Sequence, residues 1–445
     1  MSDFFRQGIT KSSKTLECRK ILPNKTESNL KINFEKNIKK IIELIENEIK
    51  PSLIIYNVLS CMYGSFYGDA FGAFYKLSKS KNINKNLMKK AQYFGGEKVQ
   101  IASGYEMAMS LAYAIMDNPF KETLDENYLY FYYGAWSISN PLNIEDTTKN
   151  AISKFDFRQF HPIKSEFKNI KDKIYNANYN SFSNGFLMRK STFIIWIFYR
   201  FYGEINKAFN EISDIKPLIS LYIRIKNLSH IDNICTHPNP ITDIVSSFYC
   251  IMGLGVLLGL RPKIILQKIK SLCEYLKKKG EKYEKEFNNS LLIHFNNFTS
   301  RNFDFSKFFG DITSKNCVNN NDIEHFKHSF LLTIYYLLNY EDYEAESGFI
   351  DIIIEICELG GDTEANCCIV GGIIGPIFGM SNFGKEFFDS LRAVSKRYIY
   401  SVALMVLYVI YLIKSNKNIE LIHNKHYFLQ TILTLLYDDF ELDFS

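Results

Sequence analysis

Gly64-Ser65-Phe66-Tyr67-Gly68-Asp69-Ala70-Phe71-Gly72 places a glycine at every fourth position of an apolar segment. Residues four apart lie on one face of a helix, so this spacing predicts a helix with a flat face that another backbone can approach. A glycine costs about 1 kcal/mol in a helix, which favours a packing role for all three. The run Cys367 to Gly379 has glycines at a similar spacing. We predict that the two smooth faces pack together.

Two acids stand where the second glycine-spaced run begins. The stretch Gly360-Gly361-Asp362-Thr363-Glu364-Ala365-Asn366 sets both carboxylates at a predicted helix start. Acids in a first turn ordinarily stabilise the helix through its dipole. Carboxylate oxygens also bind hard divalent cations. The residues by themselves leave both interpretations open.

Composition favours a folded protein without a nucleic-acid partner. The chain has 445 residues, of which 47% are hydrophobic, enough for a packed core. Its net charge of +5 comes from 53 basic and 48 acidic side chains, too balanced for a surface that neutralises phosphates. Nine cysteines without any C-x-x-C pair indicate reduced thiols rather than a disulfide framework or a zinc site. We expect an intracellular, cytoplasmic protein.

Two segments bear on membrane association. Met1 to Lys25 is polar and charged, which argues against a secretory signal. Tyr398 to Ile413 is uncharged and apolar, but it is shorter than the roughly 20 residues that a membrane span requires. We therefore predict a buried helix at Tyr398 to Ile413, and no membrane partner.

Helical spacing dominates the rest of the chain. Between Lys31 and Lys50, isoleucines recur at three- and four-residue intervals, as in an amphipathic helix. Apolar segments of helical or buried character follow at Glu106 to Met116, Thr192 to Tyr202, Ile241 to Leu258, Phe330 to Leu338 and Ile350 to Leu359. Alternating strands and hairpins are lacking. The sequence predicts an all-α protein.

The predicted organisation is one compact helical domain with two additions. Residues 1–50 form an N-terminal extension with the amphipathic helix, 51–384 form the domain, and 385–445 form a C-terminal helical extension. Within the domain, about 262–340 is an elaborated connection. Its Lys277 to Lys282 run and its Asn319 to Asn321 tract are typical of solvated helix ends or loops.

Two polar turns are candidates for ligand contact. Ser183 to Arg189 contains an Asn-Gly turn followed by an arginine, which can present amides and a guanidinium to a phosphate or carboxylate. A plain turn before an apolar helix explains it equally well. Thr236-His237-Pro238-Asn239-Pro240 holds a histidine in a rigid turn. A lone histidine is usually structural, but a rigid turn places it better for a ligand.

These segments, in this order, resemble the ADP-ribosylglycohydrolase family, which includes the dinitrogenase reductase-activating glycohydrolases and the ADP-ribosylarginine and ADP-ribosylserine hydrolases. The resemblance covers about Pro51 to Gly384. It is carried by six collinear matches: the glycine helix at Gly64 to Gly72, Glu106-Met107 with the five residues after it, Thr147-Thr148, Asn184 to Arg189, Thr236 to Pro240, and Gly360 to Asn366. One such match alone would be weak, but six in order are specific.

The resemblance implies a compact all-α domain with two metal ions, magnesium or manganese, at the mouth of an ADP-ribose cleft. It implies cleavage of the glycosidic bond between ADP-ribose and a protein side chain, and ADP-ribose or an ADP-ribosylated protein as the partner. Paired divalent ions can orient the ribose hydroxyls and a water while polarising that bond. The implied metal ligands are Asp362 and Glu364. The implied ligand contacts are Asn184, Gly185, Arg189, His237 and Asp69.

The chain departs from the family where the metals bind. The first metal motif, Thr-Asp-Asp or Ser-Asp-Asp, corresponds to Ala102-Ser103-Gly104, and no acid occurs between Glu97 and Glu106. In the closing motif Asp362 is kept and Glu364 has the longer carboxylate, but Ala365 lacks the hydroxyl. Two hard cations held close together need several anionic oxygens. Half of the site remains.

Two further positions are degenerate. Asn143 replaces the acid of the family's Pro-x-Asp-Ile-Gly segment, where the shifted acids Glu145 and Asp146 could compensate. Lys76 aligns with a glutamate that some members carry after the glycine helix and that can act as an acid or base. The lysine reverses the charge at that position.

Three hypotheses follow. The first is a degenerate family member that keeps a cleft for ADP-ribose or an ADP-ribosylated protein, with reduced or absent activity. The second is an active hydrolase that uses one metal on Asp362 and Glu364, helped by Asp69, Glu145 or Asp146. The third is a non-catalytic helical interaction protein that binds its partner through the extensions, so that replacing His237 and Arg189 changes nothing.

Overall fold

The structure is a computed structural model that describes residues 53–78, 101–117, 122–138, 141, 144–154, 164–211, 214–300, 303–313, 324–379 and 382–383. Several predictions lie outside these residues. They concern the two extensions, the apolar run Tyr398 to Ile413, the Asn319 to Asn321 tract and Asn143. These statements remain predictions.

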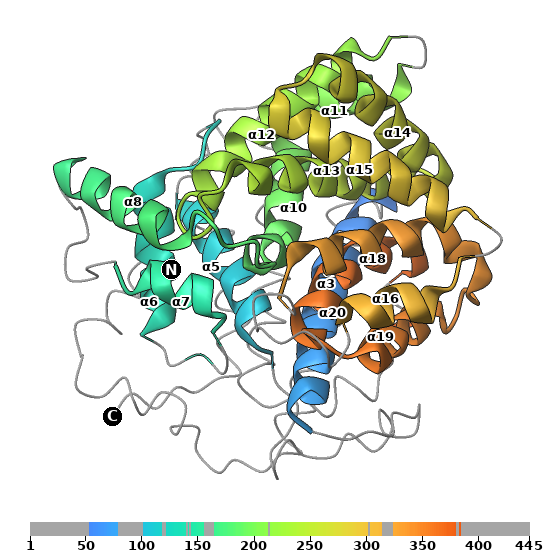
Figure 1. Cartoon of the computed structure of the whole chain (residues 1–445), viewed down its shortest axis with the longest axis horizontal. Helices are drawn as coiled ribbons and strands as arrows, with labels where there is room; N and C mark the ends of the chain where they lie inside the picture. The colour runs from blue at the N-terminus through green and yellow to red at the C-terminus, as the bar shows by residue number, and fades with distance from the viewer. Residues whose placement is uncertain are drawn as a thin grey trace, which may run out of the picture.

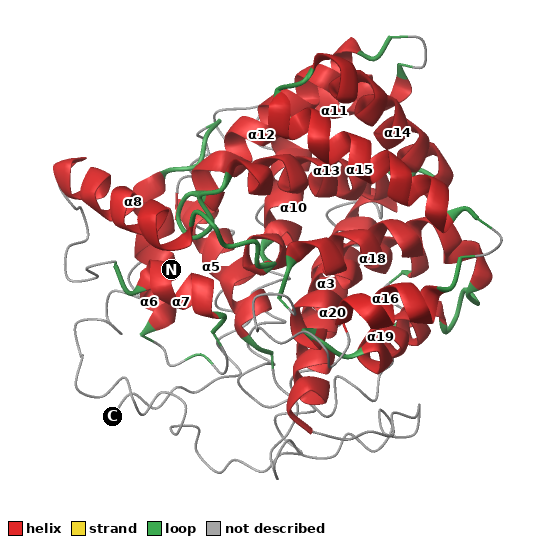
Figure 2. Ribbon diagram, viewed as in Figure 1, coloured by secondary structure: helices red, strands yellow, loops and turns green. Residues whose placement is uncertain are grey.

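Helices make up the described part of the chain, and no strand is formed there (Figure 2). One isolated antiparallel bridge joins Ser183 to His325. The α-helices are α3 (Leu53–Ser78), α5 (Ser103–Asp117), α6 (Glu126–Ser137), α7 (Asp146–Ile152), α8 (Lys164–Asn178), α9 (Gly185–Met188), α10 (Lys190–Arg200), α11 (Tyr202–Asn210), α12 (Lys216–Asn233), α13 (Pro240–Leu257), α14 (Pro262–Lys279), α15 (Lys282–Phe298), α16 (Phe305–Thr313), α18 (Phe326–Asn339), α19 (Gly348–Leu359) and α20 (Thr363–Phe378), with a 3-10 turn, η2, at Tyr340–Asp342. The all-α prediction is confirmed.

Helices α3 and α20 pack side by side along their length (Figure 1). A Cβ atom added to Gly64, Gly68 or Gly72 would overlap the backbone of α20. The α20 carbonyls that it would meet belong, in that order, to Gly371, Cys367 and Thr363. The predicted pairing of the two glycine faces is therefore confirmed, and the falling residue numbers show that the helices run antiparallel.

This pairing fixes what lies at the N-terminus of α20. Since Gly72 already faces Thr363, the next position on the same face of α3, Lys76, lies beyond the first residue of α20. The chain enters α20 from α19 through Gly360 and Gly361, whose φ angles of 77° and 72° are in the left-handed region that glycine adopts readily. Lys76 and the entrance to α20 are thereby brought together.

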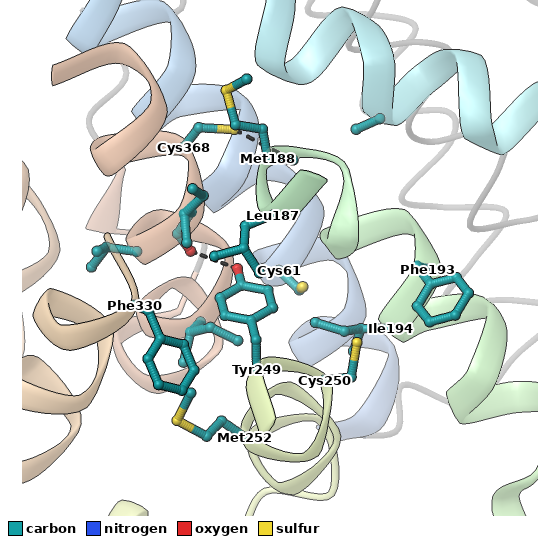
Figure 3. Close-up of a cluster of buried hydrophobic side chains, with 14 of the residues drawn as sticks. Cys61, Leu187, Met188, Phe193, Ile194, Tyr249, Cys250, Met252, Phe330 and Cys368 are labelled. Atoms are coloured by element: carbon teal, nitrogen blue, oxygen red, sulfur yellow. Dashed lines mark hydrogen bonds between the residues drawn. The ribbon is translucent and has the colours of Figure 1, made fainter. Parts of the chain in front are cut away.

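Helix α13 anchors the core behind this pair. It begins at Pro240, and the side chain of Asn239 caps it by accepting a hydrogen bond from the amide of Ile241 at 3.0 Å. Figure 3 shows Tyr249 and Cys368 in the cluster that joins α13 and α20 to α9 and α10. Tyr249 donates a hydrogen bond to the carbonyl of Ile369 at 2.6 Å.

Helix α13 is also the single helix in the described residues that is long and apolar enough to cross a membrane. However, 89% of that window is buried inside the protein. Burial of this kind is what a core helix of a globular domain shows.

The predicted elaborated connection at about 262–340 is helical where it is described. It contains α14, α15, α16 and α18. The lysine-rich run Lys277 to Lys282 falls at the junction of α14 and α15, as expected for helix ends. There, the side chains of Glu281 and Glu284 form a capping box that starts α15. The seven described cysteines are buried free thiols.

Candidate functional site

Asp362 is the N-cap residue of α20, but its carboxylate makes no capping bond to that helix. Its Oδ1 accepts a hydrogen bond from Lys76 Nζ at 2.6 Å, and its Oδ2 accepts one from Asn184 Nδ2 at 3.0 Å. Burial would lower the pKa of Lys76, but the negative charges of Asp362 and Glu364 raise it above its ordinary value. The two side chains form a charged pair. The side chain of Lys76 is 27% exposed, and that of Asp362 is 6% exposed.

Glu364 also lies near the ammonium group of Lys76. Its Oε2 is 4.0 Å from Lys76 Nζ, and its Oε1 accepts a hydrogen bond from Ser103 Oγ at 3.0 Å. The side chain of Glu364 is 3% exposed. Lys76, Ser103, Asn184, Asp362 and Glu364 are called the Asp362 cluster below. Ser103, which by the resemblance corresponds to the first acid of the family's metal motif, donates a hydrogen bond where an aspartate would add a charge.

Asp69 lies within electrostatic reach of Glu364 and caps helix α5. Its Oδ2 accepts from the amide of Ala102 at 2.6 Å, and its Oδ1 accepts from the amide of Tyr105 at 3.1 Å. A Cβ atom added to Gly104, which by the resemblance corresponds to the second acid of the metal motif, would lie 2.7 Å from Asp69 Oδ1, so a side chain there would require Asp69 to move. Burial, followed by the charge of Glu364, raises the pKa of Asp69 well above its ordinary range.

A second group of polar side chains surrounds Glu145, the residue before α7. Glu145 accepts hydrogen bonds from Ser183 Oγ and from Thr148 Oγ1, the latter at 2.7 Å, and lies 3.6 Å from His237 Nε2. Burial alone would raise the pKa of Glu145, but His237 and the two hydroxyl groups lower it to about 2. The carboxylate is therefore ionised at neutral pH. Glu145, Thr148, Ser183 and His237 are called the Glu145 cluster.

Gly185 and His237 both contact the Glu145 cluster. A Cβ atom on Gly185 would overlap Glu145 Oε2 and lie 3.0 Å from His237 Cε1, so glycine leaves the room that the carboxylate occupies. His237 is fully buried, with Nε2 2.7 Å from Ser183 Oγ and Nδ1 2.8 Å from Thr236 Oγ1. His237 is thus held at both ring nitrogens.

Asn184 connects the two clusters. Its backbone amide donates to the carbonyl of Glu324 at 2.8 Å, while its side-chain amide reaches Asp362. The residue is fully buried, and its Oδ1 has no hydrogen-bond partner in the described part of the chain. A buried acceptor without a partner costs about 1–3 kcal/mol, so a donor from outside the described residues is expected there.

Arg189 lies behind the turn that carries Asn184 and has no exposed surface. Its Nε donates to both carboxylate oxygens of Asp232 at 2.9 and 3.0 Å. The other guanidinium nitrogens donate to the carbonyl of Gly185 at 3.2 Å and to Thr236 Oγ1 at 2.8 Å. Arg189 thereby joins the Asn-Gly turn to the turn that holds His237.

Glu324 is an acid near the site that the sequence did not reveal. Its carboxyl is within electrostatic reach of Asp362, Glu145, Lys76 and Asp146. Burial, followed by the negative charges of Asp362 and Glu145, raises its pKa to about 8, although Lys76 opposes this rise. Glu324 is therefore mostly protonated at neutral pH. It lies in the elaborated connection, where no motif or periodicity distinguishes it.

The predicted site residues thus separate into three groups. Asp362, Glu364, Asn184 and Lys76 meet in the Asp362 cluster, and Asp69 lies within electrostatic reach of Glu364. Gly185 and His237 meet at Glu145, and Arg189 lies behind both. In the described residues, no three His, Cys, Asp or Glu side chains are grouped so as to hold a metal ion. The prediction of magnesium or manganese at Asp362 and Glu364 stays a prediction.

Comparison with protein families identifies the family that the motifs resemble. The model of the ADP-ribosylglycohydrolase family matches residues 51–412. A provisionally named ADP-ribosyl glycohydrolase of Acanthamoeba polyphaga mimivirus is 23% identical over 339 residues, which cover 74% of this chain and 88% of the viral protein. A solved structure described as an ADP-ribosylglycohydrolase-related protein complex aligns with a TM-score of 0.46 at 12% identity, over 79% of this chain and 97% of its own. Because the family model matches most of its length, the chain belongs to the ADP-ribosylglycohydrolase family.

Proposed function

We propose that the chain binds ADP-ribose or an ADP-ribosylated protein at a cleft bordered by the Asp362 and Glu145 clusters. Its activity as a glycosidic-bond hydrolase is reduced or absent, because the family's two-metal centre is incomplete. The proposal is supported by membership of the family and by the meeting of Asn184, Gly185, His237 and Asp362 from separate motifs.

The residues present do not fit a centre of two magnesium or manganese ions. Such ions take oxygen ligands and need several anionic ones when held close together. Ser103 and Gly104 stand where two carboxylates would be, and Ala365 lacks a hydroxyl. Of the acids that remain, Asp362 pairs with Lys76, and Asp69 accepts two backbone amides.

The observation that carries ligand binding is the unpaired Oδ1 of Asn184. This acceptor lies in a buried turn that Asp362 and Glu324 hold from two sides. Ribose hydroxyl groups are donors of the kind that such an acceptor requires. We propose that Asn184 Oδ1 receives a hydrogen bond from the ligand because it lacks a partner among the described residues, and that Arg189, whose guanidinium already donates to Asp232, Gly185 and Thr236, positions the turn rather than contacting the ligand.

Replacing Asn184 with alanine is expected to weaken ADP-ribose binding about tenfold, as the loss of one well-placed hydrogen bond would. Isothermal titration of ADP-ribose into the full chain measures this change. Asn288→Ala is the matched control, because Asn288 is also fully buried, donates one Nδ2 hydrogen bond and has an unpartnered Oδ1. It belongs to α15 and should leave the affinity unchanged. Absence of ADP-ribose binding to the unmodified chain would contradict the proposal.

A second candidate function is hydrolysis without a metal. It is favoured by the opposite pKa shifts of two acids, Glu324 and Glu145. Glycosidases use one protonated carboxyl as the acid and one carboxylate as the base or nucleophile. Glu324, with its pKa raised to about 8, is the protonated member. Glu145, with its pKa lowered to about 2, is the ionised member. In this function Glu324 protonates the leaving group.

The second candidate makes a prediction about pH. Because the acid form of Glu324 is needed, release of ADP-ribose from modified arginine or serine should persist below about pH 8 and fall above it. Glu324→Gln should abolish turnover, whereas Glu344→Gln, on an exposed residue outside the site, should leave it intact. No turnover with either acceptor, in EDTA or in magnesium, would contradict hydrolysis and leave the binding function standing.

A further inference from the structure

We propose that the ammonium group of Lys76 permanently takes the place of a divalent cation between Asp362 and Glu364. The positive charge at the site is then supplied by a side chain of α3, and the site does not bind magnesium or manganese. Lys76 Nζ lies 2.6 Å from Asp362 Oδ1 and 4.0 Å from Glu364 Oε2.

The helix pairing dictates this placement. Gly64, Gly68, Gly72 and Lys76 are spaced by four residues, and the three glycines face successive turns of α20. The same face of α3 therefore places Lys76 beside the N-terminus of α20, where Asp362 and Glu364 lie. The pairing of α3 with α20 thus holds the backbone of Lys76 close to the two acids.

Charge balance explains why the lysine is needed. The side chains of Asp362 and Glu364 are 6% and 3% exposed, and buried carboxylates without a counter-charge are costly. With its metal ligands substituted, the site offers too few oxygens to hold a divalent ion tightly in place of Lys76. A divalent ion between these acids would also lie within a few ångströms of the ammonium group, and the repulsion would oppose its binding.

A second lysine in the chain provides a matched control. Lys226 Nζ lies 2.7 Å from Glu284 Oε1 and 4.0 Å from Glu281 Oε2. Its side chain is 25% exposed, and that of Glu284 is 7% exposed, close to the values for Lys76 and Asp362. The difference is that Glu281 is 83% exposed, so that water rather than a cation can compensate it.

The experiment titrates Mn²⁺ alone into the full chain and into two variants, with heat of binding and Tm as readouts. Lys76→Gln removes the ammonium group, and Lys76→Glu adds a third carboxylate beside Asp362 and Glu364. We expect no saturable Mn²⁺ binding to the unmodified chain, weak binding to Lys76→Gln, and binding at least about tenfold tighter to Lys76→Glu. Mn²⁺ should also raise the Tm of Lys76→Gln, because it binds the folded state. The Tm of Lys226→Gln should not respond.

Two results would overturn the assignment. One is Mn²⁺ binding to the unmodified chain that Asp362→Asn abolishes. The other is a folded Lys76→Glu variant with no more affinity for Mn²⁺ than the unmodified chain has. If both Lys76 variants fail to fold, the titration of the unmodified chain decides: no Mn²⁺ binding supports the assignment, and binding that depends on Asp362 refutes it. Failure to bind ADP-ribose would overturn the proposed function, on which this assignment builds, without changing the Mn²⁺ result.

Discussion

Replacing Asp232 with alanine is expected to lower the free energy of unfolding by about 3–5 kcal/mol. Asp232 is fully buried and accepts hydrogen bonds from Arg189 at 2.9 Å, from Lys190 at 2.6 Å and from Tyr133 at 2.5 Å. Burial would raise its pKa, but Arg189 and Lys190 lower it to about 2, so the carboxylate stays ionised. Without it, two buried cations lose their counter-charge.

Urea denaturation followed by circular dichroism measures this loss. Asp232→Asn keeps the shape and removes only the charge, so it separates the loss of charge from the loss of packing. The control is Glu204→Ala, which removes the partner of Arg224 in a 2.9 Å pair whose side chains are 46% and 41% exposed. Exposed pairs contribute about 1 kcal/mol or less. Equal effects of Asp232→Ala and Glu204→Ala would contradict the role of the buried charges.

Gly68→Ala is expected to destabilise the protein by about 3 kcal/mol, the upper end of the range for overfilled cores. The new methyl group would overlap the carbonyl of Cys367, and the obstacle is the backbone of α20 rather than a flexible side chain. The helices must therefore separate, although alanine itself favours a helix over glycine by about 1 kcal/mol. Since α3 carries Lys76, we also expect the contact between Lys76 and Asp362 to loosen.

Gly203→Ala is the control for Gly68→Ala, because an added Cβ atom at Gly203 has no neighbour within 4 Å. The control should be neutral or slightly stabilising. Chemical denaturation of the two variants compares them directly. A Gly68→Ala protein as stable as Gly203→Ala would mean that α3 and α20 do not approach as closely as described.

The pairing of α3 with α20 was predictable from the sequence, because glycines spaced four apart leave one helix face without side chains and allow a second backbone to approach closely. The same spacing contained a signal that sequence reasoning missed. Lys76 continues the four-residue series of Gly64, Gly68 and Gly72, and an antiparallel pairing places it at the start of α20. Alignment to the family identified Lys76 as a reversed charge, but only the structure showed which acid it meets.

The rest of the site could not be read from the sequence because it depends on contacts between distant segments. Glu324 reaches the site through the backbone bond from Asn184, and nothing in its own segment predicts that contact. Asp232 looks like an ordinary acid on α12 until α10 places Lys190 against it. Arg189 was predicted to contact the ligand from its motif, and its complete burial among protein partners emerges only from packing.

The most direct test of the central claim, an ADP-ribose site that works without the two-metal centre of its family, is a paired calorimetric titration. ADP-ribose is titrated into one preparation of the full chain, first in EDTA and then in excess magnesium. We expect saturable binding with the same affinity in both conditions. Binding that appears only with magnesium, and disappears again in Asp362→Asn, would contradict the central claim.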